Sequence, residues 1–229
     1  DRQLGAAFES FIGQAHAPVV TGATSCKGSQ AGTSASQRTY SPLGWSLPDQ
    51  RWLIPLCATP FAATGAGARA CTMMAERETT LALAGGSCPK LVSLNSGAAY
   101  FHQARDAAAW KTLAAELSLL PADEQTAAID DLGTAFASNG AEAHVVLEVL
   151  ARAAAATETS LLTRTVLQVQ GLEKSVPEGA VEAYRVWVRG TLTGAFAQAA
   201  KRRDQAELTG VLLRALALPG RDPAIRARL

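Results

Sequence analysis

The sequence predicts a mixed α+β fold built as separate domains, in which an all-β sandwich is followed by an all-α helical solenoid. Two observations predict it. From Pro18 to about Phe101, short apolar runs are broken by Gly, Pro, Ser and Asn, a pattern typical of strands and turns. From Asp106 onward, apolar residues recur at helical spacing instead. The change of period in mid-chain indicates two kinds of architecture.

One helix is expected before the first strand. Its apolar residues fall on a single face over residues 3–13, where they are Leu4, Ala7, Phe8, Phe11 and Ile12. Gly13 is a suitable residue to end it. We therefore expect three regions, with boundaries at residues 1–17 for the terminal helix, 18–103 for the sandwich and 104–229 for the helical domain.

Seven short strands in about 85 residues, separated by turn residues, are typical of an all-β sandwich. The expected strands cover residues 19–25, 34–40, 51–57, 69–74, 79–83, 91–94 and 99–101. A loop around residues 62–67 is expected to join two of them as a hairpin.

The four cysteines all lie in the first half of the chain, at Cys26, Cys57, Cys71 and Cys88. None belongs to a Cys-x-x-Cys pair, which argues against a structural zinc knuckle. Counting outward from the predicted hairpin places Cys57 opposite Cys71, so we expect disulfides Cys57–Cys71 and Cys26–Cys88. Disulfides would favour a periplasmic or extracellular location. The alternative is buried free thiols in a cytoplasmic protein.

After residue 106, helix start signals recur about every 16–20 residues, so that a helix pair repeats about every 35–40 residues, the period of HEAT-like solenoids. Asp222-Pro223 resembles one further helix start shortly before the last residue. The chain also begins with Asp1 rather than Met. We therefore expect a fragment, with an array of helices that is truncated.

The segment 91–106 is where the pattern changes from strand to helix. Asn95-Ser96-Gly97 supplies a turn. Tyr100 and Phe101 are expected to pack between the last strand and the first helix. The residues of this predicted interdomain hinge are Asn95, Gly97, Tyr100, Phe101 and His102.

The sequence contains no complete catalytic or metal-binding motif. His16, His102 and His144 do not lie at metal-ligand spacing, and neither His-Glu-x-x-His nor Gly-x-Ser-x-Gly occurs. Asp130 and Asp131 are adjacent on a predicted helix, so they point about 100° apart and are expected to be a solvated face. We assign no catalytic, cofactor-binding or metal-binding residue to this chain.

Composition narrows the classes of partner. Charged residues make up 18% of the sequence and the formal net charge is +1, which gives no electrostatic reason to expect nucleic acid. No apolar run is long enough to be a membrane-spanning segment. The 48% of hydrophobic residues suffices for a sizeable core.

Five segments in order nevertheless resemble a known family. They are FESFIGQAHAPVVTGATSC, SQRTYSPLG, RWLIPLC, CPKLVSLNSGAAYFHQARD and LSLLPADEQTAAIDDLGTAFASN, within residues 4–140. Their order and spacing are similar to the C-terminal portion of aminopeptidase N-like zinc aminopeptidases, the gluzincin metallopeptidases. The sequence departs from the family pattern at His16, where the family has Gly, and at 99–102, where Ala-Tyr-Phe-His replaces Gly-Tyr-Tyr-Arg. Lys90-Leu91 stands where the family has Trp after Cys-Pro. These departures indicate a divergent member.

The resemblance implies a parent hydrolase that removes N-terminal residues from peptides with one zinc ion. The family's zinc ligands and general base would lie upstream of Asp1, so none is carried over to this sequence, and Zn²⁺ is expected only in the missing catalytic domain. This chain would be inactive alone. Its partners would be the catalytic domain of the same parent chain and, in the intact enzyme, peptide substrates. Its helices would shape or cover the active-site cleft. The alternative is a freestanding α-solenoid interaction module without enzymatic activity.

Overall fold

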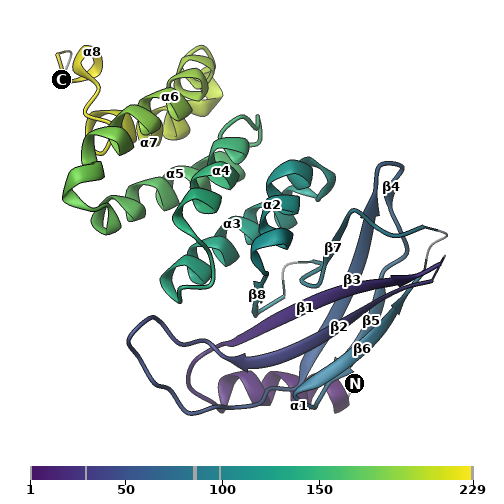
Figure 1. Ribbon diagram of the computed structural model, residues 1–229. Helices are drawn as coiled ribbons and strands as arrows, with labels where there is room; N and C mark the ends of the chain where they lie inside the picture. Colours follow the sequence, from purple (N-terminus) through teal and green to yellow (C-terminus); the bar gives the residue numbers. More distant parts are fainter. Residues whose placement is uncertain (1, 29, 85–86, 98, 228–229) are drawn as a thin grey trace. The chain divides into compact units, whose positions relative to one another are not determined.

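The computed structural model describes residues 2–28, 30–84, 87–97 and 99–227 (Figure 1). Within these residues the fold is of mixed α+β class, with two β-sheets and eight α-helices. The chain forms two compact units, Asp1–Val146 and Leu147–Leu229, which we call unit 1 and unit 2.

The first sheet of unit 1 has the strand order β6-β2-β1-β8. Its strands are β1 (Pro18–Lys27), β2 (Gln30–Thr39), β6 (Glu78–Leu83) and β8 (His102–Ala104). Strands β1 and β2 pair antiparallel along their whole length, whereas the short β8 runs parallel to β1. The last strand before the helices is therefore held against the first strand of the sheet.

The second sheet is centred on β3 (Ile54–Ala62). Three strands pair antiparallel with β3, namely β4 (Gly65–Ala66), β5 (Ala70–Met74) and β7 (Leu91–Ser93). The β3–β4 hairpin lies where the sequence predicts one. Because β3 also pairs with β5 beyond it, Cys57 stands opposite Cys71.

Both sheets contribute to one hydrophobic core, which includes Val20 and Leu81 of the first sheet and Leu56 and Met74 of the second. A polar link joins the first sheet to the segment before β3. The side-chain amide of Gln37 accepts from Trp52 N at 2.9 Å and donates to Trp52 O at 3.0 Å. Trp52 is 1% exposed, so this pairing fixes a large buried side chain at the edge of the core.

Three helices belong to unit 1: α1 (Arg2–Ile12), α2 (Ala107–Glu116) and α3 (Ala122–Ala137). Helix α1 contacts β3, α2 contacts β7 and α3 contacts β8. Helix α2 begins at the expected start signal, because the Asp106 carboxylate accepts from Ala109 N at 2.7 Å. A short 3-10 turn, η1 (Leu117–Leu119), links α2 to α3.

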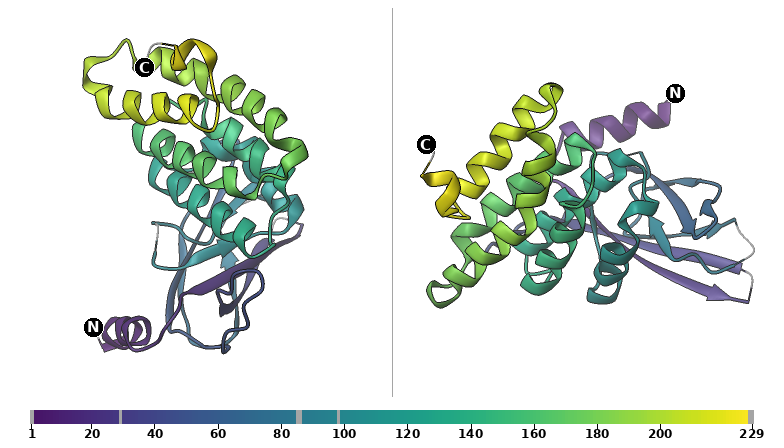
Figure 2. Two further views of the ribbon diagram at one scale, coloured as in Figure 1. Left: turned by 90° about the vertical axis from the view of Figure 1, so that its left-hand side faces the viewer. Right: turned by 90° about the horizontal axis from the view of Figure 1, so that it is seen from above.

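Unit 2 is helical, with α4 (Ala143–Ala153) crossing its boundary. The further elements are α5 (Thr159–Leu172), η2 (Glu173–Ser175), η3 (Glu178–Ala180), α6 (Val181–Ala199), η4 (Arg203–Gln205), α7 (Ala206–Ala217) and α8 (Pro223–Arg226). Helix α7 packs against both α5 and α6 (Figure 2). Val166, Val188 and Leu212, which lie where the apolar residues recur at helical spacing, are fully buried.

Most expected elements occur close to their predicted ranges. The prediction of a strand at residues 99–101 is wrong, because these residues are irregular and β8 starts only at His102. The hydrogen bonds of Asn95 to Ala99 N and Phe101 O turn this stretch of backbone away from a ladder. The region boundaries at 17/18 and 103/104 stay a prediction.

The structure contains both expected disulfides, Cys26–Cys88 and Cys57–Cys71. The first closes a sequence separation of 62 residues and the second one of 14. Both lie in unit 1, which holds the two sheets.

We predict that the longer-range disulfide contributes more to stability. Loop-closure entropy gives about 4 kcal/mol for Cys26–Cys88 and about 3 kcal/mol for Cys57–Cys71. Urea unfolding of the paired Ser variants C26S/C88S and C57S/C71S, compared with the wild type, measures both values. Mass spectrometry of the unreduced protein should show both cross-links, and four alkylatable thiols in the native sample would contradict the pairing.

Candidate functional site

The turn after β7 is built by the Asn95 side chain. Its Oδ1 accepts from Ala99 N at 2.6 Å and its Nδ2 donates to Phe101 O at 3.0 Å. Gly97 follows with φ of +89°, a region that favours glycine. A Cβ there would also lie 3.3 Å from Arg69 Nη2. The predicted roles of Asn95 and Gly97 as turn residues therefore have a direct physical basis.

The two rings of the predicted hinge have different environments. Phe101 is 5% exposed and belongs to the core, whereas Tyr100 is 83% exposed. The Tyr100 ring makes a T-shaped contact with Phe11, with ring centroids 6.1 Å apart. The expectation that both rings pack between strand and helix is wrong for Tyr100, because the turn that Asn95 builds leaves its side chain in solvent while Phe101 enters the core.

Glu124, in the first turn of α3, connects this helix to the turn after β7. The side chain is buried, and its Oε1 accepts from Ser96 Oγ at 3.1 Å and from Gly97 N at 3.2 Å. Ser96 Oγ also accepts from Arg69 Nε at 3.0 Å and lies 2.7 Å from Thr59 Oγ1. The buried carboxylate thus receives donors from the sheet side of unit 1.

Asp131 makes a second connection, between α3 and β8. Its carboxylate is 3.2 Å from His102 Nδ1, and Asp131 is 4% exposed. The prediction that Asp130 and Asp131 form a solvated face is wrong for Asp131, because this side of α3 faces β8. Burial raises the pKa of Asp131, while the hydrogen bond to His102 and the charge of Arg105 lower it.

Arg105 is the buried cation of the group. Burial lowers its pKa to about 10, opposed by the charges of Asp131 and Glu124. Its Nη2 donates to Gln103 Oε1 at 2.9 Å, and its guanidinium lies 5.7 Å from the centroid of the Trp110 ring. We call these seven residues the junction cluster: Asn95, Ser96, His102, Gln103, Arg105, Glu124 and Asp131.

The chemistry of the junction cluster is structural. Its carboxylates accept hydrogen bonds that hold α3 on the sheets, and its arginine is engaged by Gln103 and Trp110. Among the residues that the structure describes, no group of three or more His, Cys, Asp or Glu could hold a metal ion. The cluster therefore holds α3 on the sheets, and the assignment of residues 95–102 as an interdomain hinge stays a prediction.

The other two histidines lie away from this cluster. His16 follows α1 with φ of 74°. His144 Nδ1 is 3.2 Å from Glu142 Oε2, and both side chains are more than half exposed, as expected for a solvated pair. None of the helices that the structure describes combines the length and apolar character needed to cross a bilayer.

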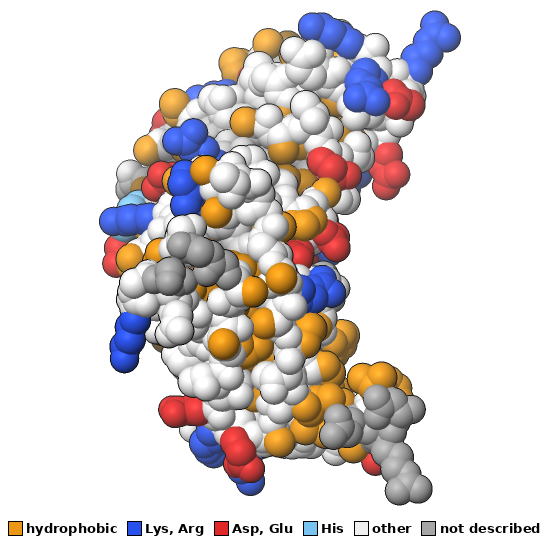
Figure 3. Space-filling model, turned by 90° about the vertical axis from the view of Figure 1, so that its right-hand side faces the viewer, with side chains coloured by type: hydrophobic (Ala, Val, Ile, Leu, Met, Phe, Trp, Pro, Cys, Tyr) orange, Lys and Arg blue, Asp and Glu red, His pale blue; other side chains and the backbone are white. Residues whose placement is uncertain are grey.

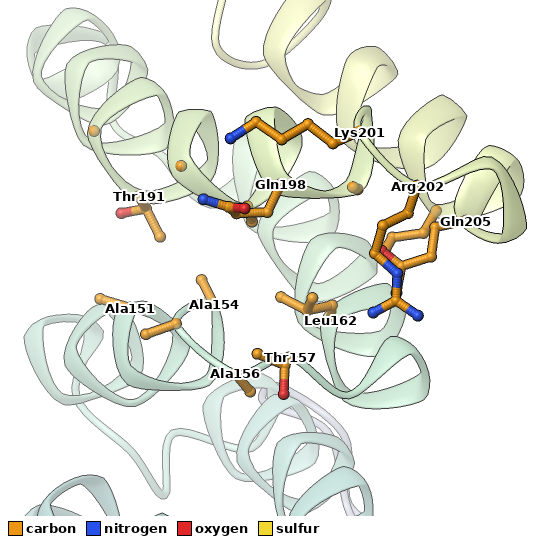
Figure 4. Close-up of a pocket in the computed structure, with 16 residues that line it drawn as sticks. Ala151, Ala154, Ala156, Thr157, Leu162, Thr191, Gln198, Lys201, Arg202 and Gln205 are labelled. Atoms are coloured by element: carbon orange, nitrogen blue, oxygen red, sulfur yellow. The ribbon is translucent and has the colours of Figure 1, made fainter.

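Unit 2 carries a separate candidate binding site, an open groove of about 720 Å³ between α4 and α6. We call it the α4–α6 groove (Figure 4). Its lining residues are Ala151, Ala154, Ala155, Ala156, Thr157, Leu162, Gly190, Thr191, Gly194, Ala195, Gln198, Ala199, Lys201, Arg202, Gln205 and Leu208. Small residues make up most of the surface, and polar groups gather where α6 leads into α7.

Sequence reasoning missed the groove. The signal that could have found it is the pair Gly190 and Gly194, one helical turn apart inside the 19-residue helix α6. A Cβ added to either glycine would meet nothing within 4 Å. Glycine in a helix interior is unfavourable. Two glycines on one face leave a strip of the helix surface without side chains at a cost in helix stability.

No protein-family model matches this chain, and comparison with curated proteins finds no match.

We predict that Glu124→Ala destabilises the protein by about 2–3 kcal/mol. Ser96 and Gly97 lose a buried hydrogen-bond acceptor, and the buried charge of Arg105 loses a counter-charge. Urea unfolding measures the loss. Glu116→Ala is the matched control, since Glu116 forms a surface pair with Lys90 at 2.9 Å and should cost less than about 1 kcal/mol. Equal losses in both variants would contradict the assignment.

Asp131 should give the stability of the protein a recognisable pH dependence. Its pKa in the folded state is raised above the usual 3.8, so the folded chain keeps a proton that the unfolded chain has released. The unfolding free energy should therefore fall as pH rises from 3.8 through the raised native pKa. Asp131→Asn removes this contribution. The free-energy difference between wild type and variant, from urea unfolding across this range, should change with pH; a constant difference would refute the prediction.

Proposed function

We propose that this chain is the non-catalytic C-terminal region of a zinc aminopeptidase. In this proposal unit 1 holds the all-β sandwich, and the helices from α2 onward are the first part of a HEAT-like superhelix that shapes or covers the active-site cleft. The zinc ligands and the general base belong to the catalytic domain of the parent chain.

The observation that carries the proposal is the outward face of α1. Leu4, Phe8 and Ile12 lie one turn apart on this helix and are 56%, 64% and 67% exposed. Figure 3 shows hydrophobic side chains gathered at the end of unit 1 near the lower edge of the view. A continuous apolar stripe of this kind normally faces another part of a protein. The resemblance identifies that part, because it makes residues 1–17 the terminal helix of the catalytic domain.

The inner face of α1 packs against the rest of unit 1. Ala7 is buried, and Ser10 Oγ accepts from Leu53 N at 3.0 Å. Gln14 Nε2 donates to Arg51 O at 2.9 Å. The helix thus has one face on the sheets and one face free, which suits a helix between two domains.

A second observation supports the resemblance. His16 stands where the family has Gly, and its φ of 74° lies in the region that favours glycine. A glycine would adopt this backbone conformation without strain, which is consistent with the family's Gly at this position. The two disulfides support the finer proposal of an extracellular or periplasmic location.

A second candidate function is a freestanding interaction module, and the α4–α6 groove favours it. Two observations discriminate the candidates. Codons upstream of Asp1 that encode His-Glu-x-x-His would support the aminopeptidase, whereas a native start just before Asp1 would support the module. Incubation of this chain with aminoacyl chromogenic substrates and zinc should give no turnover under either candidate, and chelator-sensitive turnover would contradict both.

We predict that Phe8→Ser leaves the stability of this chain within about 0.5 kcal/mol, because the ring is exposed here. In the full-length parent the same change should cost about 2–3 kcal/mol, since a buried ring loses its partners there. Thermal and urea unfolding of both proteins measure the effect.

Ser10→Ala is the matched control on the inner face of α1. It removes the acceptor for Leu53 N and should cost about 1 kcal/mol in both proteins. If Phe8→Ser has no larger effect in the parent than in this chain, the proposed contact of α1 with the catalytic domain is wrong.

A further inference from the structure

We propose that the α4–α6 groove binds a short peptide segment that carries small apolar side chains and acidic side chains. The inference concerns unit 2 alone and does not depend on whether the parent is an aminopeptidase. It is based on the size of the groove, the residues of its floor and the charges at its rim.

The groove has the size and surface of a peptide site. Its volume of about 720 Å³ lies within the usual range for ligand sites, and eight of its sixteen lining residues are Ala or Gly. Figure 4 shows Ala151, Ala154 and Leu162 on one side, facing Thr191 and Gln198 on the other. Gly190 and Gly194 have open space where a Cβ would stand, so a peptide backbone can approach α6 closely.

The charged residues that line the groove have one sign, and one of them is already paired. Its lining includes two cations, Lys201 and Arg202, and none of the described residues that line it is acidic. The Arg202 guanidinium is paired with Asp204 through Nη2 at 2.9 Å. Within the described part of the chain, no hydrogen bond or ion pair is formed by Lys201 Nζ. Lys201 therefore offers an ammonium group to a carboxylate of the ligand.

The uncharged polar groups fit a peptide backbone. Thr157, Thr191, Gln198 and Gln205 line the groove with hydroxyl and amide groups, which can donate to or accept from main-chain amides. A peptide site combines such groups with an apolar floor. Charge complementarity then selects an acidic segment over a basic one.

The test uses fluorescence anisotropy at low salt with a fluorescein-labelled probe, Ala-Ala-Glu-Ala-Leu-Glu-Ala amidated at its C-terminus, and its counterpart with Gln for Glu. The wild type should bind the Glu peptide about tenfold more tightly than the Gln peptide, and salt should weaken the binding. The amide excludes a free terminal carboxylate as the recognised group. Equal affinity for the two peptides, or no binding, would overturn the proposal.

Two variants locate the binding. Gly194→Leu places an apolar side chain in the groove from a Cβ position that has nothing within 4 Å, and it should weaken binding at least about tenfold. Gly171→Leu is the matched control, because its Cβ also has open space but Gly171 does not line the groove. Lys201→Glu should weaken binding about fivefold, whereas Lys174→Glu, away from the groove, should not.

Thermal unfolding shows that every variant is folded before its affinity is compared. Binding that survives Gly194→Leu would place the site elsewhere and overturn the proposal. If sedimentation shows that the wild type self-associates and that Gly194→Leu abolishes this, the occupant is a second copy of the chain and the peptide proposal is wrong.

Discussion

The structure of unit 1 depends on the buried carboxylate of Glu124. A carboxylate removed from water is costly unless donors replace the lost hydration. Here the hydroxyl of Ser96 and the backbone N–H of Gly97, both in the turn after β7, donate to Oε1, while Oε2 is buried without a hydrogen-bond partner among the described residues. The first turn of α3 can therefore occupy only the position at which these donors reach it. The helix and the sheets are held in register by a polar contact as well as by apolar packing.

The other buried charges strengthen this constraint. Arg105, Glu124 and Asp131 are each less than a tenth exposed, and their formal charges of +1, −1 and −1 sum to −1. His102 lies against Asp131 with a side chain 35% exposed, so this edge of the group borders solvent. A shift of α3 by one residue would leave these buried charges without partners. If the contact were apolar only, such a shift would cost much less. Such groups make one arrangement of helix and sheet more favourable than its neighbours.

The sequence predicts the parts of the fold that depend on local pattern. The pairing of Cys57 with Cys71 follows from counting outward from a hairpin, and the start of α2 follows from the capping side chain of Asp106. Asn95 and Gly97 were found because turn chemistry is local too. Asp131 was misjudged because its partner, His102, lies 29 residues away, and helical spacing alone says nothing about which side of a helix a sheet will cover. For the same reason the sequence does not predict the buried contact of Glu124, whose partners Ser96 and Gly97 precede the change from strand to helix.

The two units meet the need for stability in different ways, and this difference bears on function. Unit 1 has two disulfides and the junction cluster, which restrict how its elements can move. The described part of unit 2 has neither, and its helices are held by apolar stripes such as Val188 and Leu192 of α6. Yet α6 places Gly190 and Gly194 on an open side where larger residues would fit and would favour the helix. Open Cβ space does not by itself mark a binding surface, because Gly171 of α5 has it too; what distinguishes Gly190 and Gly194 is that both line the α4–α6 groove.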